Sequence, residues 1–249
     1  MGRKPVREAL EFKADSIDKI LLNKAARGEE IDSIRRLASS QHIPFQFVPE
    51  AKLNRLSPGT NHQGVIATIA PIAFQDVDDM LRMIAPTQDQ VKSDKPTLLV
   101  LDRIEDPHNY GAILRSALAA GVKGVIVPAR NMAQLNEAAI KTSAGTALRI
   151  PIARVKKLTE VLVQLKERGY WVVGADGDGE MSYGEYDWNK PVALVMGSES
   201  KGMRPDVKAS CDTVVSIPMY GPVESLNVSV ATALLLFKAA EVNEKKNPE

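Results

Sequence analysis

Three segments of the chain place glycine beside amide, carboxylate, hydroxyl or guanidinium side chains, the groups that bind ligands and take part in chemistry. They are DRIEDPHNYGAILR at residues 102–115, GSESKG at 197–202 and PMYGPVESLNVS at 218–229. Each follows a short apolar run, TLLVL, VALVM or TVVSI, of the kind that forms a buried parallel strand. Because ligands of open parallel sheets bind beyond the carboxyl ends of the strands, these segments are the first candidates for a functional site.

The first segment contains an amide and a guanidinium six residues apart, Asn109 and Arg115. On one α-helix six steps turn by about 600°, so the two side chains would lie about 120° apart. They converge on one ligand only if Asn109 lies in the loop before the helix. Otherwise Asn109 is a helix N-cap and Arg115 a surface arginine, and the sequence leaves both interpretations open. Gly111 and Ala112 keep this end of the helix narrow enough for another backbone to approach.

The second segment is similar to a phosphate-binding loop only in its glycines. Met203 and Arg204 follow Gly202, so the G-x-x-x-x-G-K-[ST] pattern of ATP-binding loops is not met. Its backbone amides could instead hold a ribose or an amino-acid group, or the segment could be a plain strand-to-helix turn. The loop GADGDGE at 174–180 is neither an EF-hand, because Met181 stands where that turn needs glycine, nor a dinucleotide fingerprint. We expect a loop there, with Ala175 at a strand end able to touch a ligand.

Metal and thiol chemistry are not predicted. His42, His62 and His108 lie in unrelated segments without an i+3 or i+4 partner, so we expect no metal site. Cys211 is the one cysteine, which excludes an internal disulfide, and we expect a buried, inert thiol entering a strand. The first residues lack the apolar core of a signal peptide and no stretch is apolar enough to span a membrane, which favours a cytoplasmic protein.

The first part of the chain, from residue 5 to about 70, alternates short helices and strands and predicts a small α/β unit that Pro71 ends. Apolar residues at i, i+3, i+4 and i+7 over 77–84 then predict an amphipathic helix. The polar APTQDQVKSDKP at 85–96 is typical of a linker or exposed loop. We therefore assign residues 1–72 to one domain and 73–96 to a connection that includes the helix.

Residues 97–249 predict a second, larger domain. The strands expected are TLLVLD, GVIVP, YWVVGA, VALVMG and TVVSIP, and the helices are NYGAILRSALAAG, LTEVLVQLKERG and an apolar helix from Val228 to Ala240. Strands that alternate with helices predict a mostly parallel sheet covered on both faces, so the fold class is α/β.

Composition limits the kind of partner. The chain has 249 residues, 44% of them hydrophobic, which is enough for a substantial core. Its 32 Lys and Arg against 31 Asp and Glu give a formal charge of +1. An RNA or DNA site, if present, must therefore be local, because the whole-molecule charge does not attract nucleic acid.

The three segments together resemble the motifs of the SpoU (TrmH-like) RNA ribose 2′-O-methyltransferases. N-x-G-A-x-x-R begins at Asn109, G-S-E-x-x-G begins at Gly197, and I-P-M-x-G-x-x-x-S-L-N-V-S-V-A begins at Ile217. Each motif is weak alone, but all three in order form a specific signal. GRKPVREALE and NHQGVIA also resemble the two ends of the substrate-binding domain of the bacterial large-subunit rRNA guanosine enzymes in this family.

The resemblance implies a fold and a reaction. The C-terminal domain is expected to be an α/β knot, an exception to the rule that chains do not thread loops. The N-terminal domain is expected to resemble RNA binders of the ribosomal protein L30e/L7Ae type. It further implies a homodimer that uses S-adenosylmethionine, needs no metal, and methylates the ribose of a guanosine in 23S rRNA.

Residue roles carry over by position. The resemblance makes Arg115 the catalytic residue with Asn109 as its companion, Glu199 a support, and Ser225 and Asn227 neighbours of the target ribose. The resemblance implies that the backbone at Gly197, Ile217 and Leu226 holds the methyl donor, with Met219 and Ala175 as neighbours. Basic residues expected to contact RNA phosphates are Arg3, Lys4, Arg7, Arg35 and Arg36. Ser200 departs from the family, which often has glycine there, and would be strained if the loop requires a positive φ.

An arginine is a costly general base. Its pKa near 13.8 lies about 7 units above neutral pH, so the neutral form would cost about 9 kcal/mol. We therefore expect Arg115 to bind the phosphate beside the target ribose and to stabilise the developing oxyanion.

Three other functions remain open from the sequence. The chain could methylate tRNA guanosine, it could be a non-catalytic RNA-binding or ribosome-assembly protein, or it could be a nicotinamide-dependent oxidoreductase. The last is disfavoured because no proper glycine fingerprint follows any strand.

Overall fold

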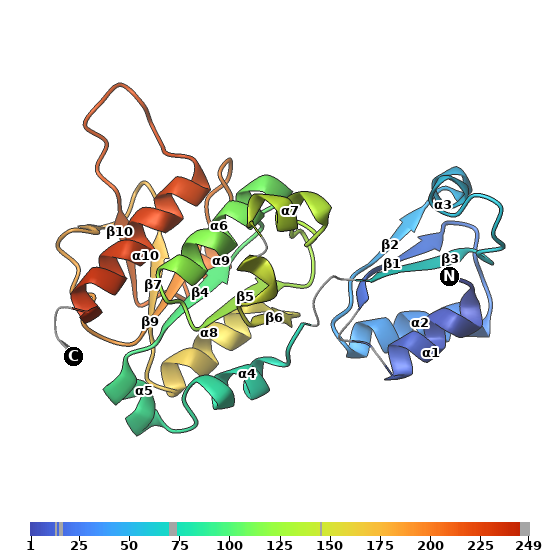
Figure 1. Ribbon diagram of the computed structural model, residues 1–249, viewed down its shortest axis with the longest axis horizontal. Coiled ribbons are helices and arrows are strands. Elements are labelled where there is room, and N and C mark those ends of the chain that lie inside the picture. The colour runs from blue at the N-terminus through green and yellow to red at the C-terminus, as the bar shows by residue number, and fades with distance from the viewer. Residues whose placement is uncertain (13, 15–16, 70–73, 145, 245–249) are drawn as a thin grey trace. The chain divides into compact units, whose positions relative to one another are not determined.

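The computed structural model describes residues 1–12, 14, 17–69, 74–144 and 146–244 (Figure 1). The chain divides into two compact units, Met1–Phe74 and Gln75–Glu249, called here the N-terminal and C-terminal units. Pro71, expected to end the first unit, lies outside the described residues.

The N-terminal unit is a three-stranded sheet with helices packed on it. In chain order its elements are α1 (Arg3–Phe12), β1 (Ile17–Asn23), α2 (Glu29–Ser40), β2 (Phe45–Val48), α3 (Glu50–Leu56) and β3 (Val65–Ile69). The strand order is β2-β1-β3, with β1 parallel to β2 and antiparallel to β3. Leu10 of α1, Ile34 of α2 and Ile20 of β1 are fully buried in one core. The amphipathic spacing of α1 and α2 therefore serves to cover one face of the sheet.

The C-terminal unit is built on a seven-stranded sheet. Its strand order is β6-β5-β4-β9-β7-β10-β8, and every described pairing is parallel. The strands are β4 (Thr97–Leu101), β5 (Gly124–Pro128), β6 (Ile152–Val155), β7 (Trp171–Ala175), β8 (Met181–Ser182), β9 (Val192–Met196) and β10 (Thr213–Ser216). All residues of β5 and β9 are buried, as expected of strands covered on both sides.

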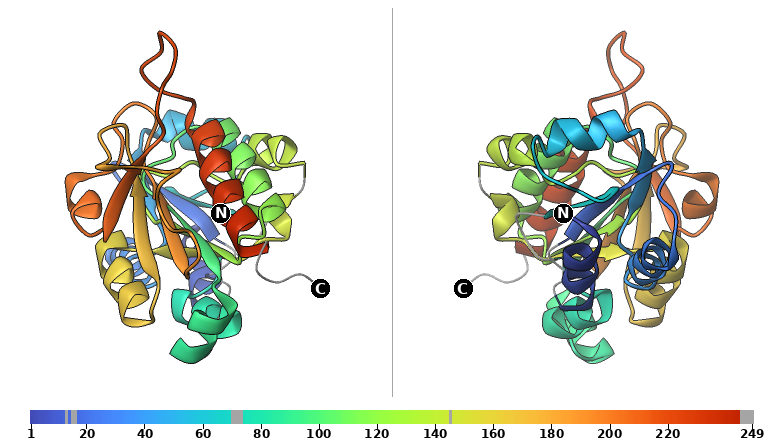
Figure 2. Two further views of the ribbon diagram at one scale, coloured as in Figure 1. Left: turned by 90° about the vertical axis from the view of Figure 1, so that its left-hand side faces the viewer. Right: turned by 90° about the vertical axis from the view of Figure 1, so that its right-hand side faces the viewer.

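Helices cover both faces of this sheet (Figure 2). On one face, α4 (Val77–Ile84), α5 (Gln88–Asp94), α8 (Leu158–Glu167) and α9 (Pro205–Lys208) contribute buried residues to a core shared with the strands. On the other, α6 (Pro107–Ala119) packs between α7 (Glu137–Thr142) and α10 (Val228–Glu244), with the short 3₁₀ helix η2 (Thr146–Leu148) beside them. The α/β prediction is confirmed, and the unit belongs to the trefoil-knot class of its structural neighbours.

Two local predictions were wrong. The segment 85–96, expected to be a linker or exposed loop, contains helix α5, because Thr87 accepts a hydrogen bond from the Gln90 N–H and Val91 is buried in the core. Helix α6 begins at Pro107 and not at Asn109, because the Asp106 side chain caps it by accepting from the His108 N–H. Asn109 therefore lies within the first turn of α6, which rules out both sequence interpretations of it.

Within the described residues, no helix combines the length and apolar character that crossing a membrane requires.

Candidate active site

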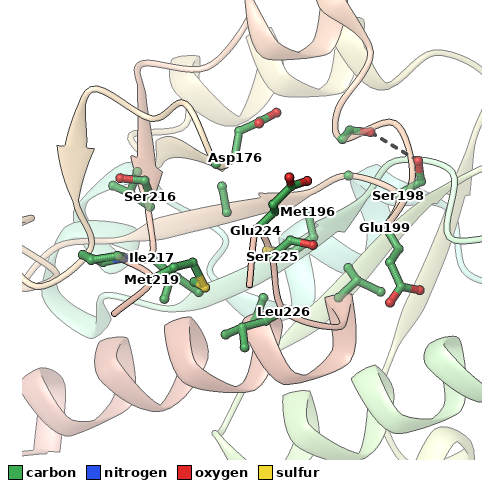
Figure 3. Close-up of a pocket in the computed structure, with 18 residues that line it drawn as sticks. Asp176, Met196, Ser198, Glu199, Ser216, Ile217, Met219, Glu224, Ser225 and Leu226 are labelled. Atoms are coloured by element: carbon green, nitrogen blue, oxygen red, sulfur yellow. Dashed lines mark hydrogen bonds between the residues drawn. The ribbon is translucent and has the colours of Figure 1, made fainter. Parts of the chain in front are cut away.

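The three polar segments of the sequence meet at the carboxyl ends of neighbouring strands. They follow β4, β9 and β10, and the loop after β7 joins them. Together the loops after β7, β9 and β10 line a pocket of about 650 Å³ (Figure 3). Its lining includes all five residues expected at the methyl donor, namely Ala175, Gly197, Ile217, Met219 and Leu226. Alternating strands and helices thus assemble one cavity from segments up to about fifty positions apart.

Close backbone packing explains the glycines of the second segment. A Cβ on Gly197 would lie 2.1 Å from the carbonyl carbon of Gly202 and 2.2 Å from the Met203 nitrogen. Gly202 adopts φ +60, a left-handed conformation that glycine tolerates best. Ser200 does not have a positive φ, so the backbone strain considered for this position does not arise.

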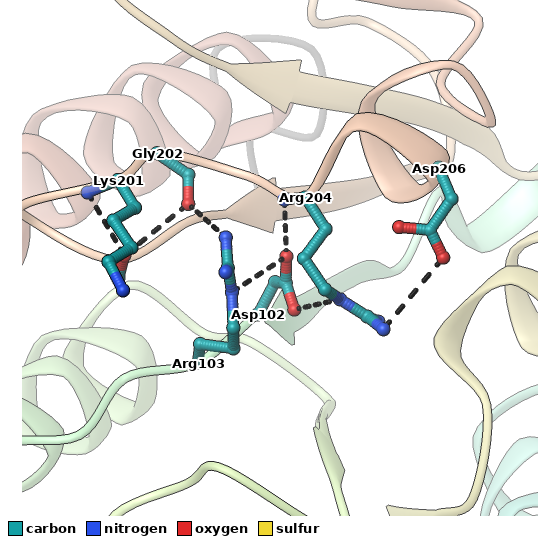
Figure 4. Close-up of polar contacts among 7 residues, drawn as sticks. Asp102, Arg103, Lys201, Gly202, Arg204 and Asp206 are labelled. Atoms are coloured by element: carbon teal, nitrogen blue, oxygen red, sulfur yellow. Dashed lines mark hydrogen bonds and ion pairs between the residues drawn. The ribbon is translucent and has the colours of Figure 1, made fainter.

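A buried carboxylate ties the first segment to the second (Figure 4). Asp102, fully buried after β4, accepts from the Arg204 backbone N–H at 2.7 Å and from its Nε at 2.9 Å. Arg103, in a left-handed conformation at φ 63, donates from its terminal nitrogen to the Gly202 carbonyl at 3.3 Å. These contacts hold the loop after β9 against the loop after β4, because a buried carboxylate must be paired with hydrogen-bond donors.

Asn109, Glu199 and Asn227 form a hydrogen-bonded cluster, one residue from each motif. Asn109 Nδ2 donates to Glu199 Oε2 at 3.2 Å, and Asn227 Nδ2 donates to Asn109 Oδ1 at 3.0 Å and to Glu199 Oε1 at 3.1 Å. Residues 118 positions apart in the sequence are therefore in direct contact. We call this group the amide–carboxylate cluster.

The backbone fixes the orientation of both amides in the cluster. The Ser229 N–H donates to Asn227 Oδ1 at 2.9 Å, and only the oxygen of a side-chain amide can accept a hydrogen bond. Asn227 must therefore direct its NH₂ group toward Asn109 and Glu199. Asn109 in turn accepts through its oxygen and donates to Glu199, so both oxygens of the Glu199 carboxylate accept an amide N–H.

A second pocket, of about 390 Å³, adjoins the first. Ser198, Glu199 and Val228 line both pockets, while Asn109, Arg103 and Lys201 line only the second. Glu199 therefore stands where the two pockets meet. Through Glu199 the cluster can contact a ligand in each pocket, whereas Asn227 lines neither of them.

Two other predicted residues lie differently. Ser225 lines the first pocket but makes no described hydrogen bond to the cluster. Arg115 is exposed on α6, about 120° around the helix axis from Asn109, and lines neither pocket. Within the chain, the structure thus brings Asn109, Glu199 and Asn227 together and leaves Arg115 apart.

Several residues line the first pocket although no individual role was predicted for them. Asp176, Met196, Ser198 and Glu224 all line the first pocket. Three of them could have been found from position alone, because Asp176 directly follows β7 and Met196 and Ser198 stand at the end of β9. Ser198 and Glu224 lie inside two of the polar segments that follow strands, so the sequence marked their loops but not these two side chains.

The pocket suits a ligand with an apolar ring and positive charge. Apolar side chains of Met196, Ile217 and Leu226 offer a surface for a flat ring system, and Asp176 and Glu224 supply carboxylates for hydroxyl or ammonium groups. The backbone at Gly202 can pack against Gly197 only because Gly197 has no Cβ. These residues fit S-adenosylmethionine, which carries an adenine ring, a ribose, an amino group and a positively charged sulfur.

In the N-terminal unit, three of the five basic residues expected at RNA are partly engaged. Arg3 lies 3.9 Å from Glu30, Arg7 lies 3.6 Å from Glu11, and Arg35 pairs with Asp32 and lies over the ring of Phe47. Lys4 and Arg36 are exposed. All five stay predictions as phosphate contacts.

The surroundings of the Cys211 thiol disfavour its reactive thiolate form. Burial raises the pKa of Cys211 to about 11, as expected for a structural cysteine. In the described part of the chain, no group of three or more His, Cys, Asp or Glu side chains could hold a metal ion.

Comparison with known proteins agrees with these features. The SpoU rRNA methylase family matches residues 96–237, and the family of RNA 2′-O ribose methyltransferase substrate-binding domains matches residues 1–75. A protein of Staphylococcus saprophyticus classed with the TrmH family of tRNA/rRNA methyltransferases is 40% identical over 247 residues, 99% of this chain and 95% of its own.

Two solved structures are similar over different lengths. The AdoMet-bound rRNA methyltransferase of Sinorhizobium meliloti has a TM-score of 0.60 and 26% identity, and covers 96% of this chain and 84% of its own. The TrmH/SpoU tRNA-modifying enzyme of A. aeolicus has a TM-score of 0.56 and 29% identity, and covers 68% of this chain and 86% of its own. The chain belongs to the SpoU family of RNA ribose 2′-O-methyltransferases, which use S-adenosylmethionine.

Proposed function

We propose that the protein methylates the ribose 2′-hydroxyl of a guanosine in 23S rRNA. The observation that carries the proposal is the amide–carboxylate cluster, which joins one residue of each motif beside the donor pocket. The guanosine and large-subunit assignments rest on the similarity of GRKPVREALE and NHQGVIA to the ends of the substrate-binding domain in the large-subunit guanosine enzymes.

The presence of the N-terminal unit favours rRNA over tRNA. The similar structure named for rRNA covers 96% of this chain, whereas the one named for tRNA modification covers 68%. The difference of 28% of the chain corresponds to about 70 residues, close to the size of the segment 1–75 that the substrate-binding family matches. Since sequence-specific RNA recognition reads splayed loops and folded shape, this unit is where we place target choice.

The cluster aligns the reacting hydroxyl. S-adenosylmethionine, when bound, supplies a methyl group already activated by a positive sulfur. The residues of this chain must therefore mainly position the ribose, and positioning alone can supply roughly 7 to 11 kcal/mol. The Glu199 carboxylate has about four acceptor sites, of which Asn109 and Asn227 occupy two. In our proposal a remaining site accepts the ribose 2′-hydroxyl from the second pocket.

In this proposal Arg115 binds a phosphate group of the RNA and does not act as a general base. Its guanidinium is exposed, and no hydrogen bond or ion pair within the described residues engages it. A free guanidinium can form two parallel hydrogen bonds to a phosphate group, which a lysine cannot reproduce. We place the phosphate next to the target ribose there, and the proton of the ribose hydroxyl leaves through phosphate or water.

Helix α10 carries the surface through which we propose that two copies of the chain form a homodimer. On α10, which packs along α6, the side chains of Val230, Leu234 and Phe237 are 48%, 41% and 50% exposed. They recur at i, i+4 and i+7, so they form one apolar stripe on the helix. A second copy of the chain is the occupant we propose, because apolar stripes of this kind mark interaction sites.

One experiment tests the proposed function. The full chain is incubated with radiolabelled S-adenosylmethionine and either 23S rRNA or tRNA transcripts, and any 2′-O-methyl group is mapped. Labelling of a guanosine in 23S rRNA is the expected result. Labelling of tRNA alone would establish the tRNA alternative, and donor binding without labelling of either RNA would favour a non-catalytic RNA-binding protein.

A further inference from the structure

The N-terminal unit contains a polar pocket whose residues lie outside the three motifs. It has a volume of about 400 Å³ and lies between the loop after β1, helix α3 and the loop before β3. Asparagine and glutamine dominate its lining, with Arg3 at the first turn of α1 and one carboxylate, Glu50. The charges of Arg3 and Glu50 cancel, so long-range attraction of phosphates does not explain the pocket.

The two loops are held together tightly. Gly64 adopts φ +79, and a Cβ added to it would lie 3.2 Å from the Ala26 Cβ and 3.5 Å from the Asn23 Cβ. The residue before it, Gln63, adopts φ 50, a conformation that is uncommon outside glycine and costs energy. The pocket therefore has a fixed shape, set by packing of the backbone.

Three of its amides are oriented by backbone N–H groups. The Ala25 N–H donates to Asn23 Oδ1 at 2.8 Å, the Gln63 N–H to Asn61 Oδ1 at 3.1 Å, and the Arg3 N–H to Gln63 Oε1 at 3.0 Å. Since only the oxygen of a side-chain amide can accept a hydrogen bond, the carbonyl end of each amide is occupied. The NH₂ end of each must therefore face away from that partner.

A fourth amide is oriented through a histidine. The Gly64 N–H donates to His62 Nδ1 at 3.0 Å, so Nδ1 carries the lone pair and Nε2 carries the hydrogen. His62 Nε2 lies 2.8 Å from Asn54 Oδ1, to which it must donate. Asn54 therefore also has its oxygen occupied. His62 is 6% exposed and serves to hold this amide in place.

The result is a pocket that offers hydrogen-bond donors. In the described part of the chain, no hydrogen bond uses the amide nitrogens of Asn23, Asn54, Asn61 or Gln63. Arg3 is held by its Nε, which donates to the Gln63 carbonyl at 3.2 Å, so the plane of its guanidinium is fixed at the edge of the pocket. Uncharged, directed donors beside a guanidinium plane match the edge and the face of a base, since unstacked bases in RNA are stacked on arginine planes and hydrogen-bonded along their edges.

We propose that this pocket binds an unpaired nucleobase of the substrate RNA. The amides of Asn23, Asn54 and Asn61 donate to carbonyl and ring-nitrogen acceptors of the base, and the Arg3 guanidinium stacks on its face. Glu50 accepts from an exocyclic amino group. The inference rests on the proposed function of this unit in RNA binding, and it gives Arg3 a stacking role where the sequence suggested a phosphate contact.

The test uses substitutions that reverse the chemistry of one amide and keep its shape. Asn23→Asp and Asn61→Asp each retain the oxygen that accepts the backbone N–H, so the loops stay folded, but replace the NH₂ donor by an acceptor. Gln46→Glu is the matched control, because Gln46 is exposed on β2 outside the pocket and the change adds the same negative charge to the same unit. Thermal unfolding of all variants checks that the fold is retained.

Binding of the full-length protein is measured by fluorescence anisotropy. The probes are labelled single-stranded RNAs of about eight nucleotides, within the usual range of site sizes, and an abasic strand of the same length. The wild type should bind at least one base-containing strand about tenfold more tightly than the abasic strand. Asn23→Asp and Asn61→Asp should each weaken that binding about tenfold, the effect of one lost hydrogen bond with a partner left unsatisfied, and Gln46→Glu should leave it within about twofold.

Three results would overturn the assignment: equal binding of the abasic strand, unchanged affinity in both asparagine variants, or an equal loss in Gln46→Glu. Affinity for S-adenosylmethionine, measured in parallel by calorimetry, separates this inference from the proposed function. A chain that binds bases as expected but methylates neither rRNA nor tRNA would refute the proposed function and still support the pocket.

Discussion

The amide–carboxylate cluster predicts that Asn227 matters more for activity than for stability, and Asn227→Ser separates the two. Asn227 has two jobs: its oxygen accepts the Ser229 N–H at the start of α10, and its NH₂ group donates to Asn109 and Glu199. Serine caps helices about as well as asparagine does, so the variant keeps the first job and loses the second. The free energy of unfolding should change by less than about 0.5 kcal/mol.

The activity loss follows from the two lost hydrogen bonds. A hydrogen bond between neutral groups is worth about 1 kcal/mol, and one to a charged group about 1.5 to 3 kcal/mol. Asn227 is exposed in the chain, so we use the lower part of this range for the bond to Glu199. The sum is about 2 to 3 kcal/mol, which corresponds to a rate about 30- to 150-fold lower if the cluster is needed in the transition state. Asn227→Asp should lose more, because it places a carboxylate against Glu199.

The assay compares initial methylation rates at saturating donor and RNA with thermal unfolding of the same preparations. Thr87→Ala is the control, because it removes the N-cap of α5, far from the pockets, and should lower stability by about 1 kcal/mol without a matching loss of rate. Wild-type rates in Asn227→Ser would refute the role of the cluster. So would an equal loss of rate in Thr87→Ala, because activity would then follow stability alone.

Four further predictions address the other features of the site. Arg115→Lys should lose activity at least about tenfold, measured as methylation rate, because an ammonium cannot form the two parallel bonds to phosphate; near-normal activity would contradict that role. Gly197→Ala should weaken donor binding in calorimetry at least about tenfold, since its Cβ would lie 2.1 Å from a backbone carbon, whereas Gly221→Ala meets nothing within 4 Å and should bind normally. Leu234→Glu should shift the protein toward monomer in light scattering. The control Val163→Glu should not, because Val163 is 53% exposed on α8 and lies outside the α10 stripe. A wild-type protein that is already monomeric would disprove the dimer. Burial disfavours the thiolate of Cys211 and sets its pKa near 11 against 9.0 for a free thiol, so alkylation of the native protein at pH 8 should be about 100-fold slower than that of the unfolded chain and should speed up as the pH rises toward 11.

Regular periodicity made some elements predictable to the residue. The apolar positions at i, i+3, i+4 and i+7 specify helix α4 at Val77–Ile84. Helix α5 was missed because its sequence is polar and only one side chain, Val91, joins the core. A short helix of this kind is stabilised by its caps and by tertiary burial, neither of which has a period.

The sequence indicated which loops carry the candidate residues, but not which of their side chains contact one another. The motifs named Asn109, Glu199 and Asn227, yet the sequence does not reveal that all three are hydrogen-bonded to one another. The resemblance gave Asn109 and Arg115 a joint role, but both residues lie on α6, where helix geometry places their side chains about 120° apart. The need for glycine at 197 is likewise a tertiary effect, caused by the backbone at 202 and 203.

The active site and the N-terminal pocket share one physical device. In both, a backbone N–H occupies an amide oxygen and so directs the NH₂ group: Ser229 does this for Asn227, Ala25 for Asn23 and Gln63 for Asn61. A neutral amide held in this way has direction but no long-range field. That suits a chain with a formal charge of +1, which gains little from attraction to the phosphate backbone.

Recognition built on directed amides has a measurable consequence. Phosphate contacts give affinity that falls steeply with salt and carries no sequence information, whereas contacts to base edges and ribose hydroxyls specify the target. The Asn23→Asp and Asn61→Asp variants also add a negative charge, so their loss of affinity is compared with that of Gln46→Glu. If the amides carry recognition, the loss in excess of this control should be equal at low and high salt. Loss of a phosphate contact at an exposed residue such as Lys4 or Arg36 should instead reduce the salt dependence itself, by about one unit in the slope of log affinity against log salt. Specificity and non-specific affinity in this protein would then reside in different side chains of the same small unit.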